Sequence, residues 1–128
     1  MTDQSDQPEE IGAIEEELSI LLHALRASRR RCVIEYLEKT EESETVSTRL
    51  LAQQIAAREN GIAVEYVSGE PYKNVYNALS QTHLPTLNSA EVIVYDPMRQ
   101  TVQKGPLFDL AALVLNLSQP AIETFYRQ

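Results

Sequence analysis

The chain has 128 residues, of which 43% are apolar, and a formal net charge of −8. This length supports one compact core but not two, so we expect a single domain. A strongly negative charge ordinarily argues against a nucleic-acid-binding protein. The longest apolar run, residues 107–117, falls short of the roughly 20 residues that span a bilayer, which argues against a membrane protein.

The acidic residues are unevenly distributed along the sequence. Those that precede the first base are Asp3, Asp6, Glu9, Glu10, Glu15, Glu16 and Glu17. Between residues 72 and 105, by contrast, three bases (Lys73, Arg99 and Lys104) occur with two acids (Glu91 and Asp96). This stretch is the least acidic part of the chain and the best suited to approach a polyanion.

The first third of the chain predicts a tail and two helices. Residues 1–10 are polar and acidic, which is typical of a flexible tail. From Ile14 onward, apolar residues recur at helical spacing and predict a first helix that stops near Ala27. Ser28 is a candidate N-cap for a second helix. Its inner side is expected to carry Cys32, Val33, Tyr36 and Leu37.

A third helix is predicted after a charged loop at residues 40–45. Ser47 or Thr48 is a candidate cap at its start, and the Asn60-Gly61 pair predicts its end. Residues 61–70 form a connector, for which both a short strand and an extended loop remain open. Pro71 suits the first turn of a fourth helix.

The fourth helix is predicted to have two unlike faces. At 100° per residue, the apolar and aromatic residues cluster on one side, and Lys73, Asn74, Asn77 and Gln81 cluster on the other. Asn and Gln pair with adenine and Lys reaches guanine or phosphate, so this face matches what a DNA major groove requires. The alternative is an ordinary solvated face. The lack of a carboxylate among these four residues favours DNA reading.

Pro85 predicts a bend near Leu84, which would turn Leu84 inward beside Leu87. Two segments with strand composition follow, at residues 93–95 and 101–103, and the residues between them favour a turn. We therefore predict a fold that is mainly α with a small β-hairpin. It is a winged helix-turn-helix domain over residues 11–105, followed by a dimerisation segment at 106–128. The predicted DNA-binding residues are Thr48, Lys73, Asn74, Asn77, Gln81, Arg99 and Lys104.

The C-terminal segment predicts a helix from Phe108 that is apolar nearly all round. Pro120 either ends this helix or starts a short final one. Such a helix needs a partner surface, which is either its own domain or a second copy of the chain. We favour a homodimer formed together with the first helix, because winged-helix regulators usually bind two-fold operators as dimers. The expected interface residues are Leu110, Leu113, Val114 and Leu117.

The sequence gives little support to an enzyme. His23 and His83 lie on predicted helix faces, where a hydrogen-bonded structural imidazole is the simpler interpretation. Cys32 lies among apolar helix neighbours, as a buried inert thiol does, and a single cysteine excludes an internal disulfide. Neither a phosphate-binding glycine loop nor a two-Cys, two-His metal spacing is present. We expect no metal and no cofactor.

Several motifs resemble known families. Arg29-Arg30-Arg31-x-x-x-x-Tyr36-Leu37 and His83-Leu84-x-x-Leu87 resemble helices of bacterial and archaeal metal-sensor-type winged-helix repressors. Gln81-Thr82-His83-Leu84-Pro85 and Val94-Tyr95-Asp96-Pro97 are more similar to a winged-helix domain of unknown function found in many haloarchaeal proteins. The latter resemblance implies a cytosol rich in potassium chloride, where an acidic surface aids solubility. The metal-sensor cysteine motif is missing, and Glu91 stands where those repressors commonly have glycine.

These observations predict a cytoplasmic DNA-binding transcriptional regulator. We expect a homodimer that reads a two-fold operator in double-stranded DNA with the helix near residues 71–84 and a wing near residues 93–104. The alternative is a winged-helix module for protein contacts. In that case the acidic surface recruits a partner protein, and the domain does not bind DNA.

Overall fold

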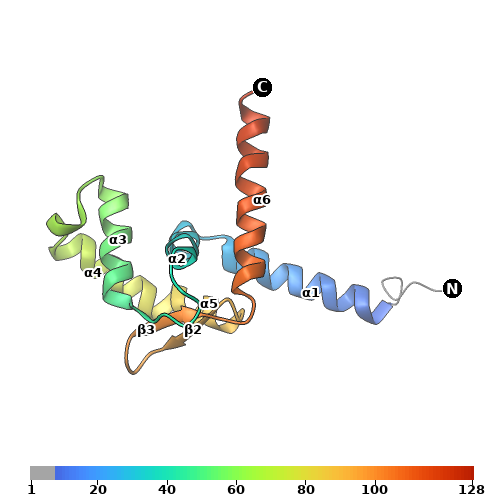
Figure 1. Cartoon of the computed structure of the whole chain (residues 1–128), viewed down its shortest axis with the longest axis horizontal. Helices are drawn as coiled ribbons and strands as arrows, with labels where there is room; N and C mark the ends of the chain where they lie inside the picture. Colours follow the sequence, from blue (N-terminus) through green and yellow to red (C-terminus); the bar gives the residue numbers. More distant parts are fainter. Residues whose placement is uncertain (1–7) are drawn as a thin grey trace.

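The structure is a computed structural model that describes residues 8–128. It is mainly helical, with a small three-stranded antiparallel sheet (Figure 1). The elements are α1 (Pro8–Leu25), α2 (Ser28–Glu38), β1 (Val46–Ser47), α3 (Thr48–Asn60), the short 3₁₀ helix η2 (Val64–Tyr66), α4 (Gly69–Ala78), the π-helical turn η3 (Leu79–His83), α5 (Leu84–Ser89), β2 (Ile93–Asp96), β3 (Thr101–Lys104) and α6 (Phe108–Tyr126).

The start of α1 differs from the predicted boundary between tail and domain. Most of the predicted tail lies outside the described residues, but Pro8 to Glu10 already belong to the helix. Glu9 and Glu10 fall in its first turn, where carboxylates interact favourably with the helix dipole. The predicted N-cap of α2 is wrong, because Ala27 precedes that helix and makes no side-chain cap. The following α3 is capped as expected, since Ser47 Oγ accepts the Leu50 N–H at 3.0 Å.

The connector and the helix after it are both more helical than predicted. Residues 64–66 form η2, which is neither a strand nor an extended loop. A bent helix then runs from α4 through η3 into α5. In η3 the Leu84 N–H bonds to the Leu79 carbonyl, five residues earlier, as in a π-bulge. This wider turn rotates Leu84 toward the core, where both Leu84 and Leu87 are fully buried, so the predicted inward turn is confirmed.

The sheet has the strand order β1-β3-β2, with β3 in the centre. The predicted hairpin is confirmed: β2 and β3 pair antiparallel, and Ile93 lies opposite Lys104. The two-residue strand β1 was not predicted, because Val46 and Ser47 carry no pattern beyond a helix cap. Its Val46 is buried opposite Val102. This pairing joins the start of α3 to the hairpin.

Two unusual backbone positions connect the hairpin to its neighbours. Glu91, at the place where glycine was noted as common, adopts φ 62° and so retains the left-handed turn that glycine would adopt more easily. Gly105 follows β3, and its N–H donates to the Val92 carbonyl. A Cβ at position 105 would lie 2.7 Å from the Glu91 carbonyl oxygen. Residue 105 therefore has to be glycine for the chain to pass this point.

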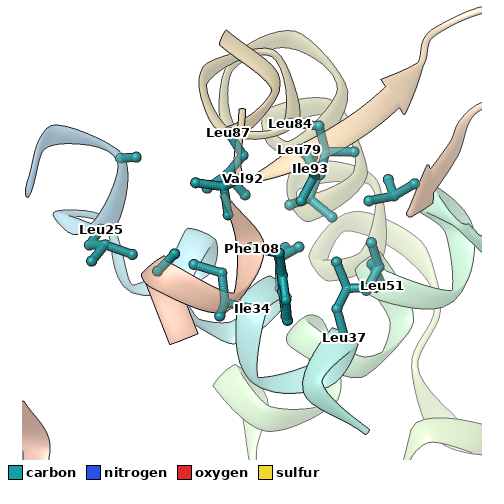
Figure 2. Close-up of a cluster of buried hydrophobic side chains, with 14 of the residues drawn as sticks. Leu25, Ile34, Leu37, Leu51, Leu79, Leu84, Leu87, Val92, Ile93 and Phe108 are labelled. Atoms are coloured by element: carbon teal, nitrogen blue, oxygen red, sulfur yellow. The ribbon is translucent and has the colours of Figure 1, made fainter. Parts of the chain in front are cut away.

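The core collects one or a few apolar side chains from nearly every element. Figure 2 shows Leu25, Ile34, Leu51, Leu87 and Phe108 among the side chains that converge on it, with Phe108 near the middle. Burial of such side chains is worth roughly 1.5–3 kcal/mol each. Phe108 is the first residue of α6, so this helix begins as part of the domain core.

The C-terminal helix is longer than either predicted outcome, because α6 continues through Pro120 to Tyr126. It packs on α2 and α1 through Phe108, Ala111, Ala112 and Leu115, which are buried. Residues 116–128 are all exposed, and so are residues 11–20 of α1. In Figure 1 both helices therefore project from the body in different directions.

Candidate nucleic-acid interface

The polar face of α4, defined here as Lys73, Asn74 and Asn77, is exposed to solvent. Its orientation follows from the opposite side of the helix, where Val75 is buried. The rings of Tyr72 and Tyr76 are half-buried, with centroids 5.9 Å apart. Because these three inner residues anchor α4 to the core, the amide and ammonium groups must point away from it.

Gln81 lies beyond the end of α4, in the π-helical turn, and is exposed. The π turn changes its angular position relative to an unbroken helix, so it does not simply continue the face of Asn77. Ser80 helps to fix this turn, because its Oγ donates to the Tyr76 carbonyl at 3.0 Å. Gln81 therefore occupies a defined place at the junction between the polar face of α4 and α5.

A carboxylate lies at the start of the polar face of α4. The sequence placed Glu70 in the connector, but α4 begins at Gly69, so Glu70 lies in its first turn and is exposed. At 100° per residue it falls on the same side as Lys73 and Asn77. The carboxylate interacts favourably with the dipole of α4, but it would oppose a phosphate placed close to it.

Tyr95 of β2 ties the hairpin to the bent helix. Its hydroxyl lies 3.0 Å from Gln100 Oε1 and 3.5 Å from the carbonyl of Ser80 in η3. Its N–H donates to Asn88 Oδ1 in α5 at 3.0 Å. These contacts fix the hairpin relative to α5 and η3.

Gln100 is the second tie, and it reaches a different helix. It adopts φ 53°, an uncommon backbone conformation for a residue other than glycine. Its carbonyl accepts the N–H of Thr48 at 2.9 Å. Through Tyr95 and Thr48, Gln100 joins the hairpin turn both to the bent helix and to the start of α3.

The tip of the hairpin presents Arg99 to solvent. Asp96 Oδ1 accepts the N–H groups of Met98 and Arg99, at 3.0 Å and 3.1 Å, which closes the turn. This use of an aspartate is typical of turns that begin with Asp-Pro. The carboxylate of Asp96 is thereby engaged by the backbone beside the Arg99 guanidinium.

Two of the predicted DNA-binding residues are turned toward the protein. Thr48 is 0% exposed, so its side chain lies inside the protein and not at the surface. Lys104 Nζ donates to the Thr40 carbonyl at 2.9 Å and lies 5.2 Å from the centre of the Phe108 ring. The ammonium group of Lys104 thus links β3 to the loop after α2 and to the start of α6.

Arg49 is a basic residue that sequence reasoning missed. It is exposed in the first turn of α3, directly after Thr48, and makes no salt bridge to any residue in the described range 8–128. The sequence could have indicated Arg49, because a basic residue two positions after the cap Ser47 lies in the first turn of the helix. Together with Arg99, it places two arginines on elements that Gln100 holds together.

The buried charge of the domain belongs to Arg30. Its Nε and Nη2 donate to the carbonyls of Ala24 and His23, at 2.7 Å and 2.9 Å, and its Nη1 lies 3.1 Å from Nδ1 of His83. Burial and the neighbouring charges of Arg30 and Arg29 lower the pKa of His83. A neutral His83 accepts from Arg30 through Nδ1, which is a structural role.

Cys32 lies half-buried in α2. Burial raises the pKa of the Cys32 thiol, which therefore favours its unreactive protonated form. Within residues 8–128 no three His, Cys, Asp or Glu side chains gather closely enough to hold a metal ion. In the same range, no helix is both long enough and apolar enough to cross a bilayer.

One known protein family covers most of the residues described above. The family model described as Domain of unknown function (DUF7344) matches residues 22–103. The chain belongs to this family. The DUF7344 region begins near the end of α1, includes α2 to α5 and the hairpin, and ends in β3. No curated protein and no solved structure matches the chain significantly.

Proposed function

We propose that this DUF7344 protein is a winged-helix DNA-binding transcriptional regulator that acts in the cytoplasm as a homodimer. The observation that carries the proposal is the exposed polar face of α4 on a bent helix that Tyr95 joins, through Ser80 of η3, to a β-hairpin with Arg99 at its tip. An exposed helix with Asn, Lys and Gln side chains suits the major groove, and an adjacent hairpin suits the DNA backbone or minor groove.

The order of elements supports a winged-helix fold. The sequence α2, β1, α3, α4 and then the β2-β3 hairpin gives three helices and a three-stranded sheet in which β1 pairs with β3. In this arrangement α3 and the bent helix form the helix-turn-helix, and residues 93–104 form the wing. Arg49, at the start of α3, replaces Thr48 as the candidate phosphate contact of this helix.

The homodimer is supported by a second apolar stripe on α6. Its buried side chains face the domain, whereas Leu110, Leu113 and Leu117 are exposed. At 100° per residue these three leucines lie together on the opposite side of the helix. A stripe with this 3-and-4 spacing is typical of helices that pack on another helix. Val114, the fourth predicted interface residue, is half-buried at the edge of this stripe.

The first helix carries a similar stripe. Leu21 and Leu25 are buried against the domain, while Ile11, Ile14 and Leu18 continue the same side of α1 but are exposed. An isolated helix as short as the exposed part of α1 or of α6 is only marginally stable in water. A partner helix would therefore stabilise both projecting segments. A second copy of the chain supplies an apolar stripe on its own α1 and another on its own α6. This supports a symmetric dimer.

Selection from random DNA duplexes tests the proposal. We expect recovery of a two-fold site, followed by measurable binding of that site by fluorescence anisotropy. Lys73→Glu should weaken binding at least about tenfold, because it places a carboxylate against the DNA. Lys39→Glu is the matched control at the exposed end of α2. Equal binding by both variants, or no enriched sequence, would contradict the proposal.

The alternative, a module for protein contacts, is favoured by one observation. Glu65, Tyr66 and Glu70 are all exposed around the start of α4, where DNA would lie closest. An exposed tyrosine flanked by carboxylates is a common contact for a basic protein. Under this alternative, charge reversal at Glu65 and Glu70 abolishes capture of a basic partner, whereas DNA binding by the parent chain is absent.

A further inference from the structure

A groove of about 660 Å³ separates α1 from the bent helix. Its α1 wall is formed by residues 19, 20, 23 and 24, and its other wall belongs to η3 and α5. The lining side chains are those of Ser19, Ile20, His23, Ala24, Gln81, Thr82, Pro85, Thr86, Ser89 and Ala90. A volume of this size falls in the range of roughly 300–1,000 Å³ that small-molecule sites occupy.

The lining has an unusual composition for this chain. Although 23% of all residues are Asp, Glu, Lys or Arg, none of these four types lines the groove. The walls are mainly apolar, with hydroxyls, one amide and the imidazole of His23 placed between apolar groups. Within residues 8–128 the side chains of Ser19, Ser89 and Gln81 make no hydrogen bond to another residue. The groove thus offers apolar contact and unused polar groups, but no carboxylate, ammonium or guanidinium group.

The groove is separate from the exposed stripe of α1 that was assigned to the dimer. Ile11, Ile14 and Leu18 lie on a different side of α1 from His23 and Ile20. The groove therefore remains open when that stripe is covered by a second copy.

Both walls of the groove are connected through Arg30. The carbonyls of His23 and Ala24 on the α1 wall accept from its guanidinium, and His83, next to Gln81 and Thr82 of the other wall, contacts Nη1. The wall of η3 is the π-helical turn that carries Gln81. A change in the distance between the walls therefore acts directly on the turn that positions Gln81.

We propose that this groove binds one small, uncharged and largely apolar molecule that carries a hydrogen-bonding group. Occupancy holds α1 and η3 at a fixed separation and so sets the position of Gln81 at the end of the polar face of α4. Binding of a molecule in the groove does not depend on the proposed function. The effect of that molecule on DNA binding does depend on the proposed function. The groove is then the site through which a metabolite of this chemical class regulates the protein.

The test uses 1-N-phenylnaphthylamine, an uncharged aromatic amine that fluoresces in apolar surroundings. The full chain, labelled with nitrogen-15, is titrated with this probe while its amide resonances are recorded. We expect saturable binding, with shifts concentrated at residues 19–24 and 81–90. Ser89→Trp and, from the opposite wall, Ser19→Trp fill the groove and should weaken binding at least about tenfold. Both positions are exposed, so folding, checked by circular dichroism, should persist in at least one variant. Ser118→Trp, on the exposed part of α6, is the matched control and should bind as the parent chain does.

Several results would overturn the proposal. These are unsaturable binding, shifts confined to the leucine stripe of α6, and parental affinity in the folded Trp variants. A second arm measures affinity for the selected DNA duplex with and without saturating probe. We expect at least an about threefold change in the parent chain and none in Ser89→Trp, as for a coupling between two sites. An unchanged DNA affinity would refute the coupling, whereas a chain that binds probe in the groove but no duplex would refute the proposed function alone.

Discussion

The guanidinium of Arg30 lies 3.1 Å from Nδ1 of His83, and no carboxylate balances its buried charge among the contacts that the structure describes. Its Nε and Nη2 donate to the Ala24 and His23 carbonyls at the end of α1, where the helix dipole is negative. Arg30 therefore connects α1, α2 and the bent helix through a single side chain.

Replacement of Arg30 by Ala should destabilise the domain by about 2–4 kcal/mol, because it leaves the Ala24 carbonyl without its donor and His83 Nδ1 without its partner. The measurement is the free energy of unfolding from urea titrations. Arg26→Ala, which removes an exposed arginine one turn away, is the control and should change the free energy by less than about 0.5 kcal/mol. Equal effects of both variants would show that Arg30 contributes no more than a surface charge.

Acidification should destabilise the protein through His83. Its folded-state pKa lies below the ordinary value of 6.5, chiefly because of burial and then because of Arg30. The unfolded chain therefore binds the proton more readily, so the contribution of His83 is complete above pH 6.5 and is lost as the pH falls through that value toward the folded pKa.

Thermal unfolding at pH 7.5 and pH 5.5 measures this effect. His83→Gln keeps an acceptor for Arg30 but cannot be protonated, so its melting temperature should differ less between the two pH values than that of the parent chain. His23→Gln changes the exposed histidine and should retain the parental pH response. If His83→Gln retains it too, another group is responsible.

The sequence predicted the framework of this protein better than its connections. Periodicity and turn residues located the helices and the hairpin, because these depend on neighbours close in sequence. The burial of Thr48 and the use of Lys104 by Thr40 depend on partners far along the chain. A two-residue strand such as β1 has no periodicity to detect.

The candidate site shows the same limit. The exposed side chains of Lys73, Asn77 and Arg99 followed from local patterns, whereas the position of Glu70 depended on where α4 begins. Helix starts are the least defined boundaries in a sequence. The π turn at Leu79–His83 depends on both Pro85 and core packing. A helical wheel at 100° per residue takes account of neither.

The double variant Leu113→Glu and Leu117→Glu should produce a monomer, because it places charges in the apolar stripe of α6. Light scattering should give a mass near 14.4 kDa for this variant and about twice that for the parent chain. Ser118→Glu adds one charge outside the stripe and should leave the dimer intact. A parent chain that stays monomeric at high concentration would remove the dimer from the proposal.

Base reading by α4 and η3 can be separated from phosphate contact. Asn77→Ala or Gln81→Ala should cost about 1–3 kcal/mol of binding free energy at particular base pairs of the selected site. Arg99→Ala should weaken binding to all duplexes more evenly. Gln119→Ala, on the exposed part of α6, and Arg127→Ala, directly after this helix, are the matched controls. Loss of affinity without any change in base preference would place sequence reading elsewhere.

Binding should depend only weakly on salt. Contact of Arg49, Lys73 and Arg99 with phosphates releases cations from DNA, with a slope of about −0.9 per phosphate in a plot of log affinity against log salt, or about −5.4 for the six such contacts of a dimer. Glu70 and the net charge of −8 oppose this release, because cations are retained where carboxylates approach a polyanion. Anisotropy titrations in potassium chloride up to the molar range should therefore show a slope shallower than about −3. A steeper monotonic loss of affinity would mean that the acidic residues lie too far from the DNA to act.

The joint at Gln100 has a thermodynamic consequence for recognition. Its left-handed backbone, the Thr48 N–H on its carbonyl and the Tyr95 hydroxyl on its side chain all restrict the hairpin in the free protein. Ordering a residue costs about 1–2 kcal/mol of conformational entropy, and here folding has already supplied that ordering. A hairpin ordered in advance keeps more of its contact energy as affinity. Its amides should therefore resist hydrogen exchange equally with and without a bound partner.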